Sequence, residues 1–112
     1  MYVLGLAGTV QEVATMMSTI PGLPASMGGD GLCDLFDPTG QMRPAGIAYV
    51  QDAIDRYEAE TAKACARFPA CRTDEGALRK MPVAAADLSD DGHPSIQGHR
   101  RQAEYVWNIF FS

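Results

Sequence analysis

The clearest hydrophobic pattern in the chain lies between residues 45 and 68. Apolar or small side chains recur there at spacings of three and four residues, and the opposite face carries charged and amide side chains. The positions on the apolar stripe are Ile47, Val50, Ile54, Tyr57, Thr61, Ala64, Cys65 and Phe68. This spacing predicts an amphipathic helix laid on a sheet or on another helix. We expect Pro69 to end it, because proline cannot continue a helix.

Three further segments have patterns of their own. Residues 1–7 are apolar at alternate and intervening positions alike, which predicts a short strand buried on both faces and closed by Gly8. Residues 10–20 show helical spacing of valine, methionine and isoleucine. Residues 95–111 predict a last helix with Ser95 as its N-cap and an apolar face. That face comprises Ile96, Ala103, Val106, Trp107 and Phe110.

The segments between these elements are rich in turn-forming residues. Glycine and proline punctuate residues 21–46, which predicts a long loop. Residues 71–73 are typical of a brief edge strand, and residues 84–88 of a turn of helix or a loop. One clear strand and two or three helices are too few for an open parallel sheet covered on both faces. The chain is therefore either a small helix-rich α/β unit or part of a larger domain.

Composition narrows the classes of partner. The chain has 112 residues, which suits one small domain, and its formal net charge is −5. A nucleic-acid-binding surface is not expected, because the basic pair Arg100–Arg101 is too small for one. No apolar run reaches the length of about 20 residues that spans a bilayer. The N-terminal residues lack the basic start of a signal peptide.

The three cysteines are Cys33, Cys65 and Cys71, so at least one thiol is unpaired within the chain. Cys65 and Cys71 lie at a helix end and just beyond it, and can meet. Cys33 can also bridge to either of them. Without a C-x-x-C pair, no structural zinc site is expected.

The residues with catalytic chemistry lie in the turn at 90–95. Asp90 and His93 have D-x-x-H spacing, from which a carboxylate can fold back onto an imidazole. In serine hydrolases the histidine takes the proton of the nucleophile, and the carboxylate orients the ring. Gly92 gives the turn its freedom and Pro94 makes its exit rigid. By spacing alone, the competing interpretation is a surface turn with a solvated histidine.

The wider string resembles a known family. Residues 90–99, with the pattern D-x-x-H-P-S-x-x-G-H ahead of a helix carrying Trp107, are similar to the last conserved block of SGNH (GDSL-type) hydrolases. Upstream, residues 65–77 (C-A-R-F-P-A-C-R-T-D-E-G-A) resemble the segment before that block in secreted bacterial members. Gly31-Leu32-Cys33 fits the same pattern, so the likeness covers roughly residues 30–111.

The resemblance implies a fold, an activity and a location. It implies that residues 1–112 are the C-terminal portion of a three-layer, flavodoxin-like α/β domain. The activity implied is hydrolysis of esters of lipids, acylated sugars or small acyl compounds, without metal or organic cofactor. Asp90 matches the acid of the family's triad and His93 its general base. Secretion to an extracellular location is implied as well.

The chain departs from the family at the nucleophile. It contains no G-D-S block, and Gly29-Asp30-Gly31-Leu32 has glycine where the serine would be, in the wrong part of the chain. The asparagine block is missing too, since Asn108 lies inside the last helix. Ser95 is committed to capping, and Ser26 and Cys33 are weak substitutes. The serine must therefore come from outside this chain.

Two other features have plainer interpretations. His93 and His99 are six residues apart, off one helix face, so we expect His99 to be a polar helix residue and not a metal ligand. The aromatic side chains of the last helix are expected in the core. These are Tyr105, Trp107, Phe110 and Phe111. Where the rest of the domain is absent, that face would be exposed and promote self-association.

Two hypotheses of function follow. The first is the acid–base part of an SGNH-type esterase or lipase, inactive or nearly so by itself. The alternative is a non-catalytic interaction or binding module derived from the same scaffold.

Overall fold

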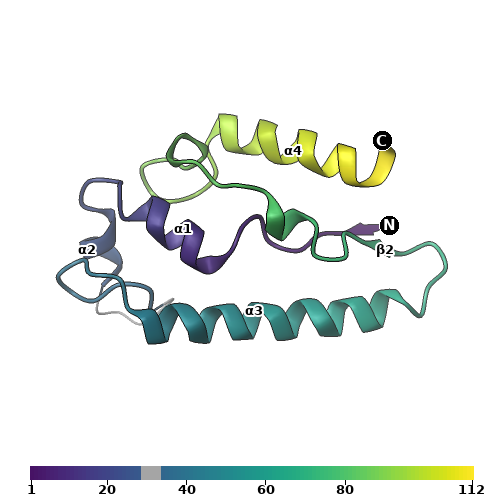
Figure 1. Cartoon of the computed structure of the whole chain (residues 1–112), viewed down its shortest axis with the longest axis horizontal. Helices are drawn as coiled ribbons and strands as arrows, with labels where there is room; N and C mark the ends of the chain where they lie inside the picture. The colour runs from purple at the N-terminus through teal and green to yellow at the C-terminus, as the bar shows by residue number, and fades with distance from the viewer. Residues whose placement is uncertain (29–33) are drawn as a thin grey trace.

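The computed structural model describes residues 1–28 and 34–112 as a helix-rich α/β unit. Two long helices flank a short pair of strands, with smaller elements between them (Figure 1). In chain order the elements are β1 (Tyr2–Val3), α1 (Val10–Met17), α2 (Leu23–Met27), α3 (Pro44–Cys65), β2 (Arg72–Thr73), the 3-10 turns η1 (Leu78–Lys80) and η2 (Ala85–Asp87), and α4 (Ile96–Phe111). None of the described helices is long and apolar enough to cross a membrane.

The two strands pair in parallel, with Tyr2 opposite Arg72 and Val3 opposite Thr73. Successive side chains of a strand point to opposite faces. On one face the Tyr2 ring lies 4.5 Å from the ring of Phe110, in α4. Helix α3 contacts β2, and Figure 1 shows α3 and α4 on opposite sides of the strands. The mixed α/β class predicted from the sequence is confirmed at this level.

The main core lies where α1 crosses the first half of α3. Ala14 of α1 is fully buried and packs with Ile47 of α3. Leu35 and Phe36, from the connection before α3, complete this cluster. The Thr9 hydroxyl caps α1 by accepting the N–H of Glu12. Local capping and apolar spacing therefore agree, and the predicted helix at residues 10–20 is confirmed over its first eight positions.

The prediction of a buried strand over residues 1–7 is wrong in extent and in burial. The strand covers only Tyr2 and Val3, while Leu4 and Leu6 are 42% and 55% exposed. The next backbone amides leave the sheet, because Gly5 donates to the carboxylate of Asp74 and Leu6 to that of Glu58. A two-stranded sheet also has no neighbouring strands that would bury these side chains.

The predicted helix at 45–68 is confirmed with shifted ends. The helix begins at Pro44 and ends at Cys65. Proline is well suited to the first position of a helix, where its missing N–H costs no hydrogen bond. After Cys65 the amides of Arg67 and Phe68 bond to carbonyls three residues back, which tightens the chain before Pro69. The apolar stripe is buried at Ile47 and Cys65, but Tyr57 and Phe68 are 76% and 62% exposed. The first half of α3 has α1 to pack on, and the second half has only the narrow sheet.

Over its described residues, the predicted loop at 21–46 contains the short helix α2 and a bridge between Phe36 and Met42, and its last three residues belong to α3. The edge strand expected at 71–73 and the helical turn expected at 84–88 are both present, as β2 and η2. A disulfide joins Cys65 to Cys71. This bond fits an extracellular protein, because disulfides persist in oxidising surroundings. Cys33 and the Gly29–Leu32 string lie outside the described residues.

Candidate active site

The turn that carries His93 lies between η2 and α4 and is closed by its own backbone. The N–H of Ser89 donates to the carbonyl of His93 at 2.7 Å, and the N–H of Gly92 donates to the carbonyl of Ser89 at 2.9 Å. The Ser89 hydroxyl oxygen also lies 2.9 Å from the carbonyl oxygen of His93. Gly92 has φ +82°, a left-handed conformation that favours glycine. The sequence-predicted role of Gly92 therefore has a direct geometric basis.

The imidazole of His93 pairs with Asp91. Its Nδ1 lies 3.2 Å from Asp91 Oδ2, and the backbone N–H of His93 donates to Asp91 Oδ1 at 3.2 Å. The imidazole side chain is 80% exposed. When Nδ1 carries the proton toward Asp91, Nε2 is left as the acceptor. A ring held in this way has the tautomer that a general base requires.

The Asp91 carboxylate is itself held in place. The Ser89 hydroxyl donates to Oδ1, and this bond, together with the His93 N–H, lowers the pKa of Asp91 from 3.8 to about 2. Hydrogen bonds to the charged form of a carboxyl group favour that form. Asp91 is therefore ionised throughout the pH range in which a histidine acts as a base.

Asp90, the acid expected from D-x-x-H spacing, is exposed. Among the described residues it has no hydrogen bond or ion pair with His93, whose carboxylate partner is Asp91. The structure thus brings His93 together with the neighbouring aspartate. The predicted pairing of Asp90 with His93 is not present in this conformation, and the catalytic role of either aspartate stays a prediction.

The turn is anchored to α4 by an ion pair between the buried Asp87 and the partly exposed Arg101. Asp87 is 4% exposed, and its Oδ2 accepts the N–H of Ala84 at 2.8 Å and a hydrogen bond from the Arg101 guanidinium. Burial raises the pKa of Asp87, but the Ala84 N–H and the Arg101 guanidinium outweigh it, so the pKa is lowered overall. The other oxygen, Oδ1, is buried without a hydrogen-bond partner among the described residues. This pair fixes η2 against the second turn of α4.

Backbone contacts hold the other end of the turn. Ser95 caps α4 by accepting the N–H of Gly98 at 3.1 Å, and its hydroxyl donates to the carbonyl of Ala86 at 2.7 Å. The predicted N-cap is confirmed. At Gly98 a Cβ atom would lie 2.2 Å from the carbonyl oxygen of Asp87, so only glycine lets α4 approach η2 this closely. The chain therefore enters and leaves the His93 turn at two fixed points.

The serines of the described region are engaged in local bonds. Ser89 donates to the Asp91 carboxylate, Ser95 to the carbonyl of Ala86, and Ser26 to the carbonyl of Leu23 at 2.7 Å. None of these contacts joins a serine hydroxyl to the imidazole nitrogens of His93. Cys33, the other substitute considered, lies outside the described residues. These contacts give His93 no activated serine.

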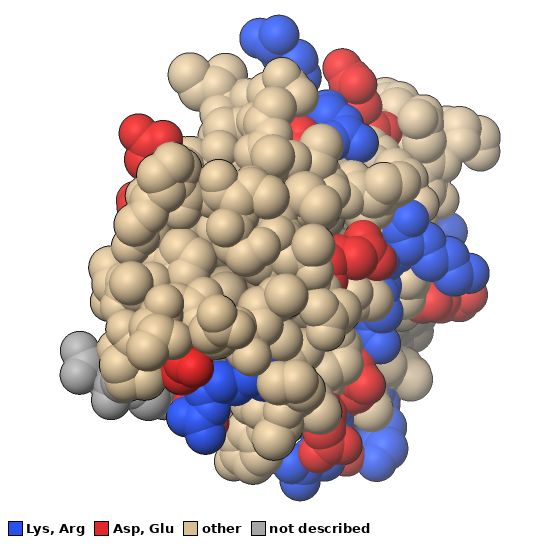
Figure 2. Space-filling model, turned by 60° about the vertical axis from the view of Figure 1, so that its left-hand side comes forward, with Lys and Arg blue, Asp and Glu red and all other residues tan. Residues whose placement is uncertain are grey.

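The chain segment that packs beside Gly92 of the turn is uncharged. No Asp, Glu, Lys or Arg occurs between Glu12 and Asp30. Met17 and Leu23, from this stretch, are the side chains that a Cβ at Gly92 would meet, at 2.6 and 3.3 Å. Figure 2 brings the α1–α2 end of the molecule forward, and side chains other than Lys, Arg, Asp and Glu cover most of that view. The charged side chains gather along its edge.

The remaining candidates lie in α4. His99 is an exposed helix residue, and the described residues contain no cluster of three His, Cys, Asp or Glu side chains placed to bind a metal. The prediction that the four aromatic side chains of α4 lie in the core is wrong: Tyr105 and Phe110 are half-buried, and Trp107 and Phe111 are 63% and 51% exposed. Near the end of the helix, the Tyr2 ring packs against Phe110 and Phe111.

Three residues of the site were not predicted as such: Ser89, Asp91 and Asp87. The first two had a readable signal, because Ser89, Asp91 and His93 alternate along the turn as S-x-D-x-H. Short polar side chains two residues before a backbone amide commonly bond to it. Asp87 had no such signal, since its partner Arg101 is 14 residues away.

Comparison with protein-family models, curated proteins and solved structures found no match for the chain.

Proposed function

We propose that residues 1–112 form the acid–base part of a serine ester hydrolase of the SGNH (GDSL) type. The proposal rests on the resemblance of residues 90–99 to the last block of that family. The observation that carries it is the contact of 3.2 Å between His93 Nδ1 and Asp91 Oδ2 on an imidazole that is 80% exposed. That arrangement leaves Nε2 free to face a nucleophile.

His93 acts as the general base and then as the general acid. Nε2 takes the proton from a serine hydroxyl as the oxygen attacks the ester carbonyl, and returns it to the departing alcohol. The carboxylate beside Nδ1 holds the tautomer and stabilises the imidazolium ion. The serine is supplied by a segment that is not among residues 1–112, and no metal or organic cofactor takes part.

Either Asp90 or Asp91 could be the carboxylate that orients His93, and the two can be told apart by experiment. The resemblance assigns the acid to Asp90, while the contacts favour Asp91, which lies 3.2 Å from Nδ1 of the ring and accepts the backbone N–H of His93. Asp91 is also the carboxylate whose pKa is lowered to about 2 by Ser89 and the His93 N–H. We assign the orienting role to Asp91 in this conformation. Asp90 takes that role only if the turn rearranges when the domain is complete.

The surroundings of the turn support an ester with an uncharged acyl group. Met17 and Leu23 lie against Gly92, within a stretch of chain that has no charged residue between Glu12 and Asp30. Methionine side chains adapt readily to apolar ligands. Leu23 is buried, so Met17 is the apolar side chain that is partly open to a substrate, and lipid or small acyl esters suit it better than charged substrates do.

The fold supports the same proposal at a coarser level. The parallel strands lie between α3 and α4, in the order helix, sheet, helix (Figure 1). We propose that this is the C-terminal portion of a three-layer, flavodoxin-like domain. In such a domain further parallel strands extend the sheet, and secretion accounts for the Cys65–Cys71 disulfide.

The first experiment is to translate the coding DNA upstream of the Met1 codon. An in-frame G-D-S block, followed by a glycine block and an asparagine block, is expected. Stop codons directly upstream would overturn the assignment of this chain to a larger hydrolase.

The second experiment measures hydrolysis of a butyrate ester of p-nitrophenol by the extended chain. His93→Ala is expected to lower kcat by about 10⁴-fold or more, because the serine loses its base. The matched control is His99→Ala, an exposed histidine on α4, which should keep full activity. Activity that survives His93→Ala would remove the catalytic assignment altogether.

The rival hypothesis is a non-catalytic interaction module. The observation that favours it is the number of large apolar side chains left exposed, among them Tyr57, Ile96 and Trp107. Surfaces of this kind often mark contact sites. Under this hypothesis, the extended chain has no ester hydrolysis that depends on His93, and the assay above separates the two.

A further inference from the structure

The outer edge of β2 has backbone groups that point away from β1. Arg72 and Asp74 donate their N–H groups to the carbonyls of Met1 and Val3, at 3.0 and 3.2 Å. Because backbone groups alternate along a strand, the N–H and C=O of Thr73 point to the opposite side. Thr73 therefore presents one donor and one acceptor along the outer edge of the sheet.

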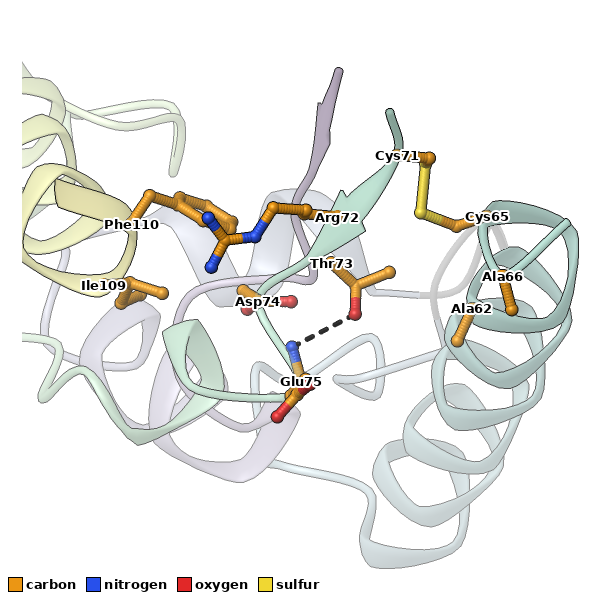
Figure 3. Close-up of a pocket in the computed structure, with 10 residues that line it drawn as sticks. All are labelled: Ala62, Cys65, Ala66, Cys71, Arg72, Thr73, Asp74, Glu75, Ile109 and Phe110. Carbon is orange, nitrogen blue, oxygen red and sulfur yellow. Dashed lines mark hydrogen bonds between the residues drawn. A yellow bond between two sulfur atoms is a disulfide. The ribbon is translucent and has the colours of Figure 1, made fainter. Parts of the chain in front are cut away.

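A hollow lies along this edge, with a volume of about 340 Å³. One wall comes from the end of α3, at Ala62 and Ala66, and the other from α4, at Ile109 and Phe110. Strand β2 lies between them, and the Cys65–Cys71 disulfide is at one end (Figure 3). No residue of β1 lines the hollow, so it is on the outer side of β2.

The two walls differ in chemistry. On the α4 side, the guanidinium of Arg72 lies 5.7 Å from the centre of the Phe110 ring. Arg72 is exposed and has no ion-pair partner among the residues described. On the α3 side, the methyl groups of Ala62 and Ala66 leave room beside Thr73. Two carboxylates also line the hollow: Asp74, which already accepts the N–H groups of Gly5 and Leu78, and the exposed Glu75. An anionic group therefore fits only beside Arg72, and an aliphatic group fits the α3 side.

A parallel sheet made of only two short strands is unusual in a folded protein. Parallel sheets are normally covered on both faces and have more strands, and an open edge is a template for a further strand. Here α3 and α4 already cover the two faces and extend past β2 as walls. The open edge of β2, with a helix on either side, is therefore suited to binding an extended polypeptide segment.

We propose that the outer edge of β2 binds an extended segment of a partner polypeptide as an added strand. In that strand an acidic side chain pairs with Arg72, and the next side chain, which is aliphatic, packs against Ala62 and Ala66. The backbone of the partner bonds to the N–H and C=O of Thr73. This is β-augmentation, in which backbone bonds give affinity and alternate side chains give specificity. It is compatible with the ester-hydrolase proposal when the further strands of that domain join the sheet at β1, which leaves β2 as the edge strand.

The test uses a six-residue peptide that alternates valine and glutamate, acetylated and amidated at its ends, with ¹⁵N-labelled protein. Its control is the same peptide with lysine for glutamate. The glutamate peptide is expected to bind about tenfold more tightly, from the charge pair with Arg72. Amide exchange at Thr73 should slow on binding, and exchange at Tyr2, on the outer edge of β1, should not.

Two variants sharpen the test. Arg72→Glu should reverse the preference, so that the lysine peptide binds more tightly. Thr73→Pro should abolish binding, because it removes the outward N–H while the amides of Arg72 and Asp74 stay paired with β1. His93→Ala should bind as the unaltered chain does, so this result and the catalytic one are separable.

The proposal fails if the glutamate peptide does not bind. It also fails if binding perturbs the outer edge of β1 or the exposed α4 aromatics instead of Thr73, or if Arg72→Glu leaves the preference unchanged. Sedimentation of the chain without peptide provides the last check. A dimer whose Thr73 amide is protected would assign the edge to a second copy of this chain and overturn the assignment to a different partner.

Discussion

Asp91 holds His93 at two points: Oδ2 lies 3.2 Å from Nδ1 of the ring, and Oδ1 accepts the backbone N–H at 3.2 Å. One carboxylate thereby sets both the position of the residue and the orientation of its imidazole. A carboxylate that bonds Nδ1–H selects the tautomer with a free Nε2. The geometry thus yields a prediction that needs no substrate.

Replacing Asp91 by asparagine should reduce the fraction of neutral His93 that carries its proton on Nδ1. An amide can present its NH₂ group to the ring, which removes the preference imposed by an acceptor-only carboxylate. The measurement is ¹⁵N NMR of the imidazole nitrogens at a pH high enough for the ring to be neutral. Asp90→Asn is the matched control and should leave the tautomer ratio unchanged. If Asp90→Asn shifts the ratio and Asp91→Asn does not, Asp90 is the partner.

Ser89→Ala should raise the pKa of Asp91 from about 2 toward its ordinary value of 3.8. The Ser89 hydroxyl is the largest cause of the lowered pKa, because it donates to the ionised carboxyl group. The pKa of Asp91 is measured directly by following its carboxyl ¹³C shift from about pH 1.5 to about pH 6, the range in which aspartates titrate. In the parent chain this bond stabilises the turn above pH 3.8 and is lost as the pH falls toward 2. An unchanged pKa in Ser89→Ala would show that the hydroxyl does not bond there.

Asp87→Ala should lower the free energy of unfolding by about 3 kcal/mol at neutral pH, because it removes the buried partner of Arg101. Asp90→Ala, on the exposed part of the same turn, should change it by less than about 0.5 kcal/mol. The folded-state pKa of Asp87 is lowered from 3.8, so its stabilising effect is present above that pH and declines below it. Urea unfolding at pH 7 and at pH 3 measures both effects. Equal losses for Asp87→Ala and Asp90→Ala would contradict the ion pair.

Gly98→Ala should destabilise the protein by about 1–3 kcal/mol, although alanine is by itself the better helix former. The added Cβ would lie 2.2 Å from the Asp87 carbonyl oxygen, so α4 must move away from η2. Thermal unfolding followed by circular dichroism gives the sign. As a control, Ala103→Gly at an exposed position of α4 should cost about 1 kcal/mol from propensity alone. A stabilised Gly98→Ala protein would show that the close approach is absent.

Replacing both Cys65 and Cys71 by serine should lower the free energy of unfolding by about 2 kcal/mol, the value expected for so short a loop. Serine at one position only would leave a free thiol, so the double variant is the cleaner one. Urea unfolding of the oxidised parent and the double variant gives the difference. A double variant as stable as the parent would mean that the disulfide does not form in solution.

Helices were readable from the sequence because each depends mainly on its own spacing and caps. Val10–Met17 and Ile96–Phe111 have serine or threonine N-caps directly before an apolar face, and both caps are present. The end of α3 was less readable. Pro69 is the strong local signal, but the helix stops earlier, at Cys65, where the disulfide to Cys71 turns the chain.

Burial was harder to predict than secondary structure. The stripe on α3 and the aromatic face of α4 were both expected in a core, yet Tyr57 and Trp107 are exposed. Apolar spacing shows which side of a helix is suited to burial, but not whether another element is present to cover it. The site shows the same limit. D-x-x-H spacing singled out His93 as a candidate, whose role stays a prediction, while its contact with Asp91 and not Asp90 appears only in the folded turn.

The hydrogen bonds around the imidazole and its carboxylate join residues 89–93 to one another, and the Leu88–Pro94 bridge and the bond from the Ser95 N–H to the Asp87 carbonyl close the ends of the turn. The local geometry is therefore encoded in nine consecutive residues, 87–95, and these bonds do not involve α3 or the sheet. A cyclic peptide of this segment is expected to keep the Asp91–His93 contact. Grafting the segment as a loop should transfer the same contact to another protein.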